Sequence, residues 1–408
     1  MRGLFGLICV LALGVMALVG CETTGGGGGS AGSGGVGGDG GQGGVGGGTV
    51  ACVDNLCPCT EAGIRAAIAE GGGPFTFDCD VPTTVEIEAE IVIDNDVILD
   101  GEDNLTVDGH ESHRVFSVPE GVKAELNRLA TKGGAVGFAN EGTLTLQDCV
   151  VAEHRSEFLF GCGAGISNEG EMTIIDSTVT GNYAGHGTGG GICNHRNATL
   201  LLVDSTVSDN GADGDGPGLY GGGISNQGEM TIINSTVSGN DAYDAVVGEG
   251  LGGGIANTGW MSVTNGTVSG NSADSGDAIA IGQSSYTEIA STLIDGDCDS
   301  TGDGSTLTRV SLGYNIESPG NTCGFDQTGD QVNVSADDLN LGPLQNNGGP
   351  TETHALLPGS PAINQIPQAD CIDADGAPLA TDQRGEPRPD TGGTTCDVGA
   401  FERQPTDP

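Results

Sequence analysis

Basic residues are scarce in this chain. Its 408 residues include 12 Lys and Arg against 56 Asp and Glu, which gives a formal net charge of −44 at pH 7. A surface of this charge repels phosphate backbones, so the composition excludes a nucleic-acid partner. It is compatible with divalent cations or basic partners, and it also keeps an exposed protein soluble.

Aromatic residues are also few, at 4% of the chain with a single Trp. This disfavours a globular core built on large rings. The 77 glycines follow no strict period, which excludes collagen, and no helical period of 3.6 runs through the chain. The hydrophobic 36% favours a narrow core of stacked aliphatic side chains.

The middle of the chain repeats a unit of about 30 residues, the signature of a solenoid. Each copy starts with glycines and an Ile-x-Asn triplet, continues through a β-branched run and ends at a second asparagine. We expect equivalent positions to stack as ladders, one of isoleucines and one of asparagines. Their members are Ile166, Ile192, Ile224, Ile255, Asn168, Asn194, Asn226 and Asn257.

Each unit has two β-branched runs and therefore predicts two short strands, with the length variation falling into loops at 183–188, 211–220 and 241–251. A propeller blade needs about 40 residues and four strands, which is too much for this unit. The fold class predicted is all-β, a right-handed parallel β-helix. The Gly-Gly-Ile and Ser-Thr-Val-x-x-Asn blocks resemble the repeats of polymorphic outer membrane proteins, which have phenylalanine where this chain has Ser-Thr-Val.

The two ends of the predicted solenoid differ. Residues 60–70 read as a short amphipathic helix with Thr60 as N-cap, placed to cover the first coil. Residues 341–364 read LGPLQNNGGPTETHALLPGSPAIN, followed by TDQRG at 381–385 and DVGAFE at 397–402. These segments resemble the choice-of-anchor Q domain, whose members are surface proteins with β-helical bodies and varied anchors. The resemblance informs fold and location and implies no chemistry.

The first residues read as an export signal. Arg2 precedes an apolar stretch, residues 4–19, that is shorter than the roughly 20 residues of a membrane span. Leu18-Val19-Gly20-Cys21 resembles a bacterial lipobox, which implies cleavage before Cys21 and a lipid on its thiol. Glu22 stands where an aspartate would retain enteric lipoproteins in the inner membrane. We therefore expect an exported protein that is lipid-anchored to the outer membrane or cell surface.

Five segments follow from these patterns. They are a signal peptide at 1–20, the lipidated cysteine with a glycine-rich flexible tether at 21–50, an N-terminal cap with the first coils at 51–130, the repeat β-helix at 131–335, and the choice-of-anchor Q-like region at 336–408.

Export makes disulfides the expected use of the eleven cysteines that remain after Cys9 and Cys21 are set aside. Proximity suggests Cys57 or Cys59 with Cys79, Cys298 with Cys323, and Cys371 with Cys396. Cys149, Cys162 and Cys193 lie on neighbouring repeats, and the odd count leaves one thiol over. The alternative at Cys52, Cys57 and Cys59 is a metal site, but no matching pair of ligands follows.

The sequence contains no assembled catalytic motif. Gly185-His186-Gly187 superficially matches a polygalacturonase element, but no aspartate pair or Arg-x-Lys motif accompanies it. Two acidic loops could bind calcium, which prefers oxygen ligands. The calcium candidates are Asp209, Asp213 and Asp215 in one loop and Asp295, Asp297, Asp299 and Asp303 in the other.

The functional expectation is a non-enzymatic surface lipoprotein, acting in adhesion, binding or envelope structure. Its expected partners are the membrane, through the lipid, and glycans or surface proteins. The alternative is a carbohydrate-active or carbohydrate-binding protein of the pectate-lyase-like superfamily, a polysaccharide lyase or glycoside hydrolase if it is an enzyme. No cofactor is certain, and calcium is the one considered.

Overall fold

The computed structural model describes residues 51–157, 161–214, 218–219, 221–244, 250–300, 308–374 and 376–407. The predicted signal peptide, Cys21 and the tether lie outside these residues, as do Asp215 and Asp303. Among the described residues, the helices lack the length and hydrophobicity that spanning a bilayer requires.

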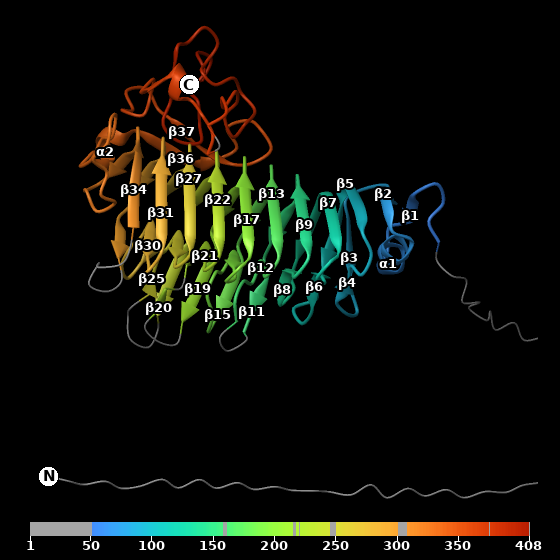
Figure 1. Cartoon of the computed structure of the whole chain (residues 1–408). Helices are drawn as coiled ribbons and strands as arrows, with labels where there is room; N and C mark the ends of the chain where they lie inside the picture. The colour runs from blue at the N-terminus through green and yellow to red at the C-terminus, as the bar shows by residue number, and fades with distance from the viewer. Residues whose placement is uncertain are drawn as a thin grey trace, which may run out of the picture. The chain divides into compact units, whose positions relative to one another are not determined.

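Each repeat unit makes one coil of a solenoid, and its strands pair in parallel with those of the coils before and after it (Figure 1). The fold is a right-handed parallel β-helix, which confirms the predicted class. Within the described residues, three parallel sheets of 19, nine and five strands form its sides, and we call them the long sheet, the asparagine sheet and the five-stranded sheet.

The long sheet receives two strands from every repeat. The first coils contribute β1 (Leu56–Pro58), β2 (Gly72–Asp78), β3 (Thr83–Glu86), β5 (Val97–Asp108) and β7 (Lys123–Lys132). The longer repeat strands are β9 (Thr143–Gln147), β13 (Glu171–Ile175), β17 (Thr199–Val203), β22 (Glu229–Ile233), β27 (Trp260–Thr264), β31 (Tyr286–Ala290) and β34 (Thr308–Gly313). The shorter ones are β10 (Val150–Ala152), β14 (Thr178–Thr180), β18 (Thr206–Ser208), β23 (Thr236–Ser238), β28 (Thr267–Ser269), β32 (Leu293–Asp295) and β35 (Ile316–Ser318).

The other two parallel sheets complete the coils. The asparagine sheet consists of β4 (Ile91–Val92), β6 (Arg114–Val118), β8 (Val136–Asn140), β12 (Ile166–Asn168), β16 (Ile192–Asn194), β21 (Ile224–Asn226), β26 (Ile255–Asn257), β30 (Ile279–Ile281) and β33 (Cys298–Ser300). The five-stranded sheet consists of β11 (Arg155–Ser156), β15 (Tyr183–Gly185), β19 (Gly211–Gly214), β24 (Asp241–Asp244) and β29 (Ser272–Ala273). A small parallel pair is formed by β20 (Gly218–Leu219) and β25 (Gly250–Leu251).

The expectation of two strands per unit was wrong in two respects. The run at 172–179 is divided because Asp176 adopts a left-handed φ of 48°, which turns the chain between β13 and β14. The segments expected as loops begin with strands of the five-stranded sheet, for example at Tyr183. These strands are short and contain Gly, Ala and Asp, so they carry no β-branched signal.

The core consists of inward side chains that stack from coil to coil. Along β13, Met172 and Ile174 are buried and their neighbours are more exposed, as alternation in a strand requires. The register places the isoleucines of the predicted ladder on one another, Ile166 on Ile192, Ile192 on Ile224 and Ile224 on Ile255.

The asparagines of the same strands form a buried hydrogen-bonded row. Asn168 donates to Asn194, Asn194 to Asn226 and Asn226 to Asn257, each from Nδ2 to Oδ1 at 2.8 Å. A second row, at the end of the shorter strands, runs through Asn182, Asn210, Asn240 and Asn271 at 2.9 Å. The polar core groups therefore satisfy one another along the axis.

The helix α1 (Glu61–Glu70) confirms the predicted N-terminal cap. The side chain of Thr60 accepts a hydrogen bond from the backbone of Gly63, and Ile64, Ala67 and Ile68 are buried in the main core. Figure 1 shows α1 at one end of the stack. Near the other end, Phe325 is buried in the same core.

The C-terminal region lies against the side of the solenoid, over the ends of the middle and later strands (Figure 1). It contains α2 (Ala336–Leu339), the hairpin of β36 (Leu341–Gln345) with β37 (Thr353–Leu356), the pair of β38 (Ile366–Pro367) with β39 (Thr395–Cys396), and the 3₁₀ helix η1 (Gln368–Asp370). Thr236 donates to the side chain of Gln383 at 2.6 Å, and Ser238 bonds to His354 at 2.8 Å. The outward side chains of the shorter strands thus form its contact surface.

Five disulfides use ten cysteines of the described chain. They are Cys52–Cys57, Cys59–Cys79, Cys162–Cys193, Cys298–Cys323 and Cys371–Cys396. The last two confirm the expected pairs, and the others settle the alternatives, because Cys57 pairs with Cys52 and the metal alternative loses its thiols. The remaining thiol is Cys149, which is buried, and burial raises its pKa to about 12.

A charged pocket beside the five-stranded sheet

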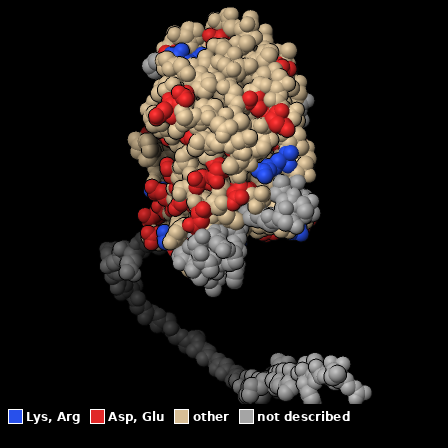
Figure 2. Space-filling view, turned by 90° about the vertical axis from the view of Figure 1, so that its left-hand side faces the viewer, with Lys and Arg blue, Asp and Glu red and all other residues tan. Residues whose placement is uncertain are grey.

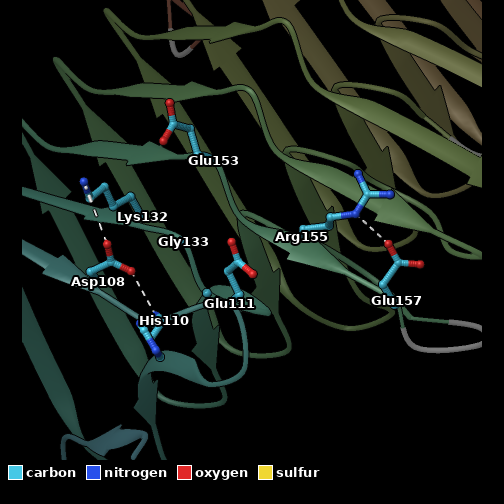
Figure 3. Close-up of a pocket in the computed structure, with 9 residues that line it drawn as sticks. Asp108, His110, Glu111, Lys132, Gly133, Glu153, Arg155 and Glu157 are labelled. Atoms are coloured by element: carbon cyan, nitrogen blue, oxygen red, sulfur yellow. Dashed lines mark hydrogen bonds and ion pairs between the residues drawn. The ribbon is translucent and has the colours of Figure 1, made fainter. Parts of the chain in front are cut away.

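A hollow with a volume of about 710 Å³ lies on the side of the early coils. We call it the charged pocket. It is lined by Asp108, His110, Glu111, Lys132, Gly133, Gly134, Glu153, Arg155 and Glu157 (Figure 3). Four carboxylates and two of the few basic side chains of the protein therefore surround one space.

The pocket lies where the number of strands per coil changes, because the five-stranded sheet begins at β11. β11 is the terminal strand of the five-stranded sheet, so within residues 51–157 the coils before it lack this strand. There the chain passes from β7 to β8 through Gly133 and Gly134. A Cβ on Gly134 would lie 2.7 Å from the carbonyl oxygen of His113, so only glycine allows this close approach. The glycine pair thus leaves an open floor beside the wall made by Arg155.

Ion pairs and hydrogen bonds hold the lining side chains. Lys132 Nζ lies 3.8 Å from Asp108 Oδ2, and Asp108 Oδ1 accepts the backbone N–H of His110 at 2.9 Å. Across the pocket from this pair, Arg155 Nε lies 2.6 Å from Glu157 Oε1. Both members of this second pair are more than half exposed, so the pair orients the guanidinium and adds little stability. Figure 3 shows Glu111 and Glu153 between the two pairs, without a drawn partner.

The guanidinium of Arg155 also stacks on the ring of Tyr183. The guanidinium carbon lies 4.5 Å from the centroid of the Tyr183 ring, within the range of a cation–π contact. Burial and the neighbouring Asp213, whose Oδ2 accepts the phenol hydroxyl at 3.3 Å, raise the pKa of Tyr183. The Arg155 side chain is therefore ordered between a ring and a carboxylate.

A neutral histidine supports the floor. His154 is almost fully buried, and its Nδ1 accepts the backbone N–H of Gly134 at 3.0 Å. Nε2 then carries the proton and donates to Thr131 Oγ1 at 3.0 Å. Burial lowers the pKa of His154 to about 4, so the imidazole is uncharged at neutral pH. Its role is structural, because both nitrogens are occupied by the protein.

The pocket can bind a polar ligand through groups of both kinds. Carboxylates accept hydrogen bonds, while lysine and arginine only donate them. A ligand with many hydroxyl groups can pair with both sets, since each hydroxyl donates and accepts.

The calcium candidates do not converge in the part of the chain that the structure describes. Asp213 binds Tyr183, Asp295 accepts from Ser269 at 2.9 Å, and Asp297 accepts the backbone N–H of Asp277 at 2.7 Å. Asp299 accepts from Ser275, and Asp209 is exposed at a left-handed turn. Since Asp215 and Asp303 are outside the described residues, calcium stays a prediction.

One group of potential metal ligands occurs among the described residues. The ligand atoms of Cys162, Cys193 and His195 lie within 4.8 Å of one another. The two sulfurs are bonded to each other, so neither is available as a thiolate, and the imidazole Nε2 of His195 is hydrogen-bonded to Ser167 at 3.1 Å. Cys162 and Cys193 therefore form a disulfide in this structure and not a metal site.

Sequence reasoning missed the charged pocket. Asp108, Lys132 and Arg155 belong to successive coils but fall outside the repeated motif. The only signal available was the presence of basic residues in a chain that has so few. The scarcity is general: Figure 2 shows many Asp and Glu but few Lys or Arg on the end face opposite α1.

The strand pairing defines a parallel β-helix protein with a charged pocket on its side. No protein-family model matches the chain, and no curated protein matches it. Among solved structures, the chain is similar to the crystal structure of pectate lyase Pel9A, with 14% sequence identity and a TM-score of 0.47. The similarity covers 83% of this chain and 90% of that chain.

Proposed function

We propose that the charged pocket binds a neutral glycan and that the protein is a binding module of the cell envelope. The observation that carries this proposal is the arrangement of acceptors and donors around one open hollow, with Arg155 held in place by Glu157 and Tyr183. Such an arrangement suits the hydroxyl and ring oxygens of a sugar.

The charge of the protein favours a neutral ligand over an anionic one. The pocket holds four carboxylates against two basic side chains, within a chain of net charge −44. A uronate or sulfated chain would meet repulsion both at long range and in the pocket itself. A neutral sugar meets none.

The test is glycan binding by the chain from residue 49 onward, which forms a compact unit by itself. A panel of neutral and uronate oligosaccharides is screened, and binding is then measured by calorimetry. We expect binding of a neutral glycan and a loss of about tenfold or more for Arg155→Ala, since hydrogen bonds to charged groups contribute roughly 1.5–3 kcal/mol.

The matched control is Arg196→Ala, which removes an exposed arginine outside the pocket. Equal affinities of the two variants would place the ligand elsewhere. Binding of uronates alone, or of no glycan, would contradict the proposal.

Cleavage of the bound glycan is the second candidate function, favoured by the several carboxylates around the pocket. Hydrolysis needs one carboxyl group as acid and a second as base or nucleophile. Release of reducing ends that disappears in Glu153→Gln or Glu111→Gln would support it. We expect binding without release of reducing ends.

For the location we propose export and lipid attachment at Cys21, with the tether holding the β-helix away from the membrane. Support comes from the lipobox-like sequence and from the disulfides, which are typical of oxidising compartments. Cells fed a labelled fatty acid should produce a labelled protein in the membrane fraction, and Cys21→Ala should abolish the label. An unlabelled wild-type protein would contradict lipidation.

We also propose that residues 336–408 are a choice-of-anchor Q domain and that the repeats are related to those of polymorphic outer membrane proteins. Support comes from the packing of the two shorter motifs on each other. Arg384 donates to the carbonyl of Glu402 at 2.7 Å, and its guanidinium lies 3.7 Å from the Phe401 ring centroid. Asp382 accepts the backbone N–H of Glu402 at 3.0 Å.

A further inference from the structure

The five-stranded sheet carries a second polar surface that begins where the charged pocket ends. Its register aligns Arg155, Tyr183, Gly211, Asp241 and Ser272 as one row along the solenoid axis. The neighbouring row of Ser156 and three alanines is buried, so the first row faces outward. Figure 1 shows β11, β15 and β19 following one another along the stack.

A second outward row lies beside the first. It aligns Gly185, Asp213 and Tyr243 on consecutive coils. The side chain of Tyr243 is 52% exposed, so its ring can be reached from the solvent. The Tyr183 hydroxyl crosses to this row by its bond to Asp213, so the two rows form one surface with aromatic rings and carboxylates.

Arg155 joins this surface to the pocket. It lines the pocket and stacks on the ring of Tyr183. The ring in turn uses space that Gly211 leaves free, since a Cβ on Gly211 would lie 3.0 Å from Tyr183 Cδ2. Pocket, guanidinium, ring and the following carboxylates thus succeed one another in the direction of the axis.

We infer that the ligand is an extended neutral polysaccharide that runs along the solenoid axis, from the charged pocket over Tyr183 towards Tyr243. This inference rests on the proposed function and names the ligand class of that site. Strands of adjacent coils are about 4.8 Å apart, which is close to the length of one sugar unit in an extended β-linked chain. Successive sugars therefore meet successive coils. The exposed ring of Tyr243 offers a stacking face, and the exposed carboxylate of Asp241 and the guanidinium of Arg155 offer hydrogen bonds.

The test is the dependence of affinity on glycan length. The probes are the disaccharides and hexasaccharides of four neutral β-linked chains: glucan, mannan, xylan and chitin. Calorimetry with the chain from residue 49 onward should show at least tenfold tighter binding of the hexasaccharide of the recognised chain. Tyr243→Ala should remove about tenfold of this gain and leave the disaccharide affinity unchanged, while Arg155→Ala should weaken both.

Tyr286→Ala is the matched control, because Tyr286 lies on the outward face of β31 in the long sheet. It should change neither affinity. Gly211→Ala is a second probe, since the added methyl group displaces the Tyr183 ring and should weaken hexasaccharide binding. Equal affinities for both lengths, or a Tyr243→Ala variant with the full gain, would overturn the inference while the proposed function stands. Failure of all probes to bind would overturn both.

Discussion

His154 shows how a single buried group couples the pocket to pH. The folded protein keeps its imidazole neutral down to a pKa of about 4, whereas an unfolded histidine takes up a proton below about 6.5. The depressed pKa means that the stabilisation is complete above pH 6.5 and is lost as the pH falls towards 4. Over this window the unfolded state binds one proton more than the folded state.

We predict that this one residue contributes about 3 kcal/mol to the acid sensitivity of the protein between pH 6.5 and 4, at 1.36 kcal/mol per pKa unit. Urea unfolding of the wild type and of His154→Gln at a series of pH values measures it. The variant loses the buried imidazole at neutral pH, and the difference in unfolding free energy between the two proteins should shrink as the pH falls. Parallel curves would show that His154 does not titrate in this window.

At the scale of one element, the asparagine sheet depends on its row of buried amides. Asn226 accepts from Asn194 and donates to Asn257, and its Nδ2 also reaches the carbonyl of Trp260 at 2.9 Å. The row is fully buried, so its amides are hydrogen-bonded to protein groups and not to bulk water. Each amide is therefore needed by the coil before it and the coil after it.

We predict that Asn226→Ala lowers the free energy of unfolding by about 2–4 kcal/mol, since it removes several buried hydrogen bonds and leaves their partners unpaired. Asn321→Ala, at an exposed position, is the control and should change it by less than about 0.5 kcal/mol. Urea unfolding at pH 7.5 gives both values. A loss for Asn226→Ala no larger than the control would mean that the neighbouring amides find other partners.

This element was predictable because its contacts repeat. Residues equivalent to Ile192 and Asn194 recur at the same place in successive units, so their stacking follows from the period alone. The split at Asp176 and the strands at Tyr183 and Asp241 were not predictable, because a left-handed aspartate and short Gly- and Ala-containing strands leave no hydrophobic pattern. The pocket was missed for a different reason: Lys132 and Arg155 come together only where the coils depart from the repeat, so periodicity does not place them near each other.

At the scale of the whole molecule, the C-terminal region is attached to the solenoid through buried polar groups. Gln383 is fully buried; its Nε2 donates to Thr206 at 2.8 Å and to Thr351 at 2.9 Å, and its Oε1 accepts from Thr236. The contacts to Thr206 and Thr236 join residues that are far apart in the sequence. Gln383 also belongs to a segment that does not repeat. Periodicity therefore could not reveal these contacts.

We predict that Gln383→Leu loosens this region without unfolding the coils. Limited proteolysis should cut within residues 336–407 faster in the variant, and the unfolding free energy should fall by about 2–4 kcal/mol. Gln345→Leu, whose side chain is exposed, serves as the control. Unchanged cleavage in Gln383→Leu would show that the remaining contacts suffice.

The position of the C-terminal region also has a consequence for the order of folding. A simple solenoid can add coils as the chain emerges, because each coil contacts only its neighbours. Here Gln383 donates to the carbonyl of Ser205, 178 positions earlier. The C-terminal region can therefore cover the shorter strands of the middle coils only after the end of the chain has been synthesised. Since closing so long a loop is slow, export of the chain would leave Thr206 and Thr236 open to water until the last segment arrives.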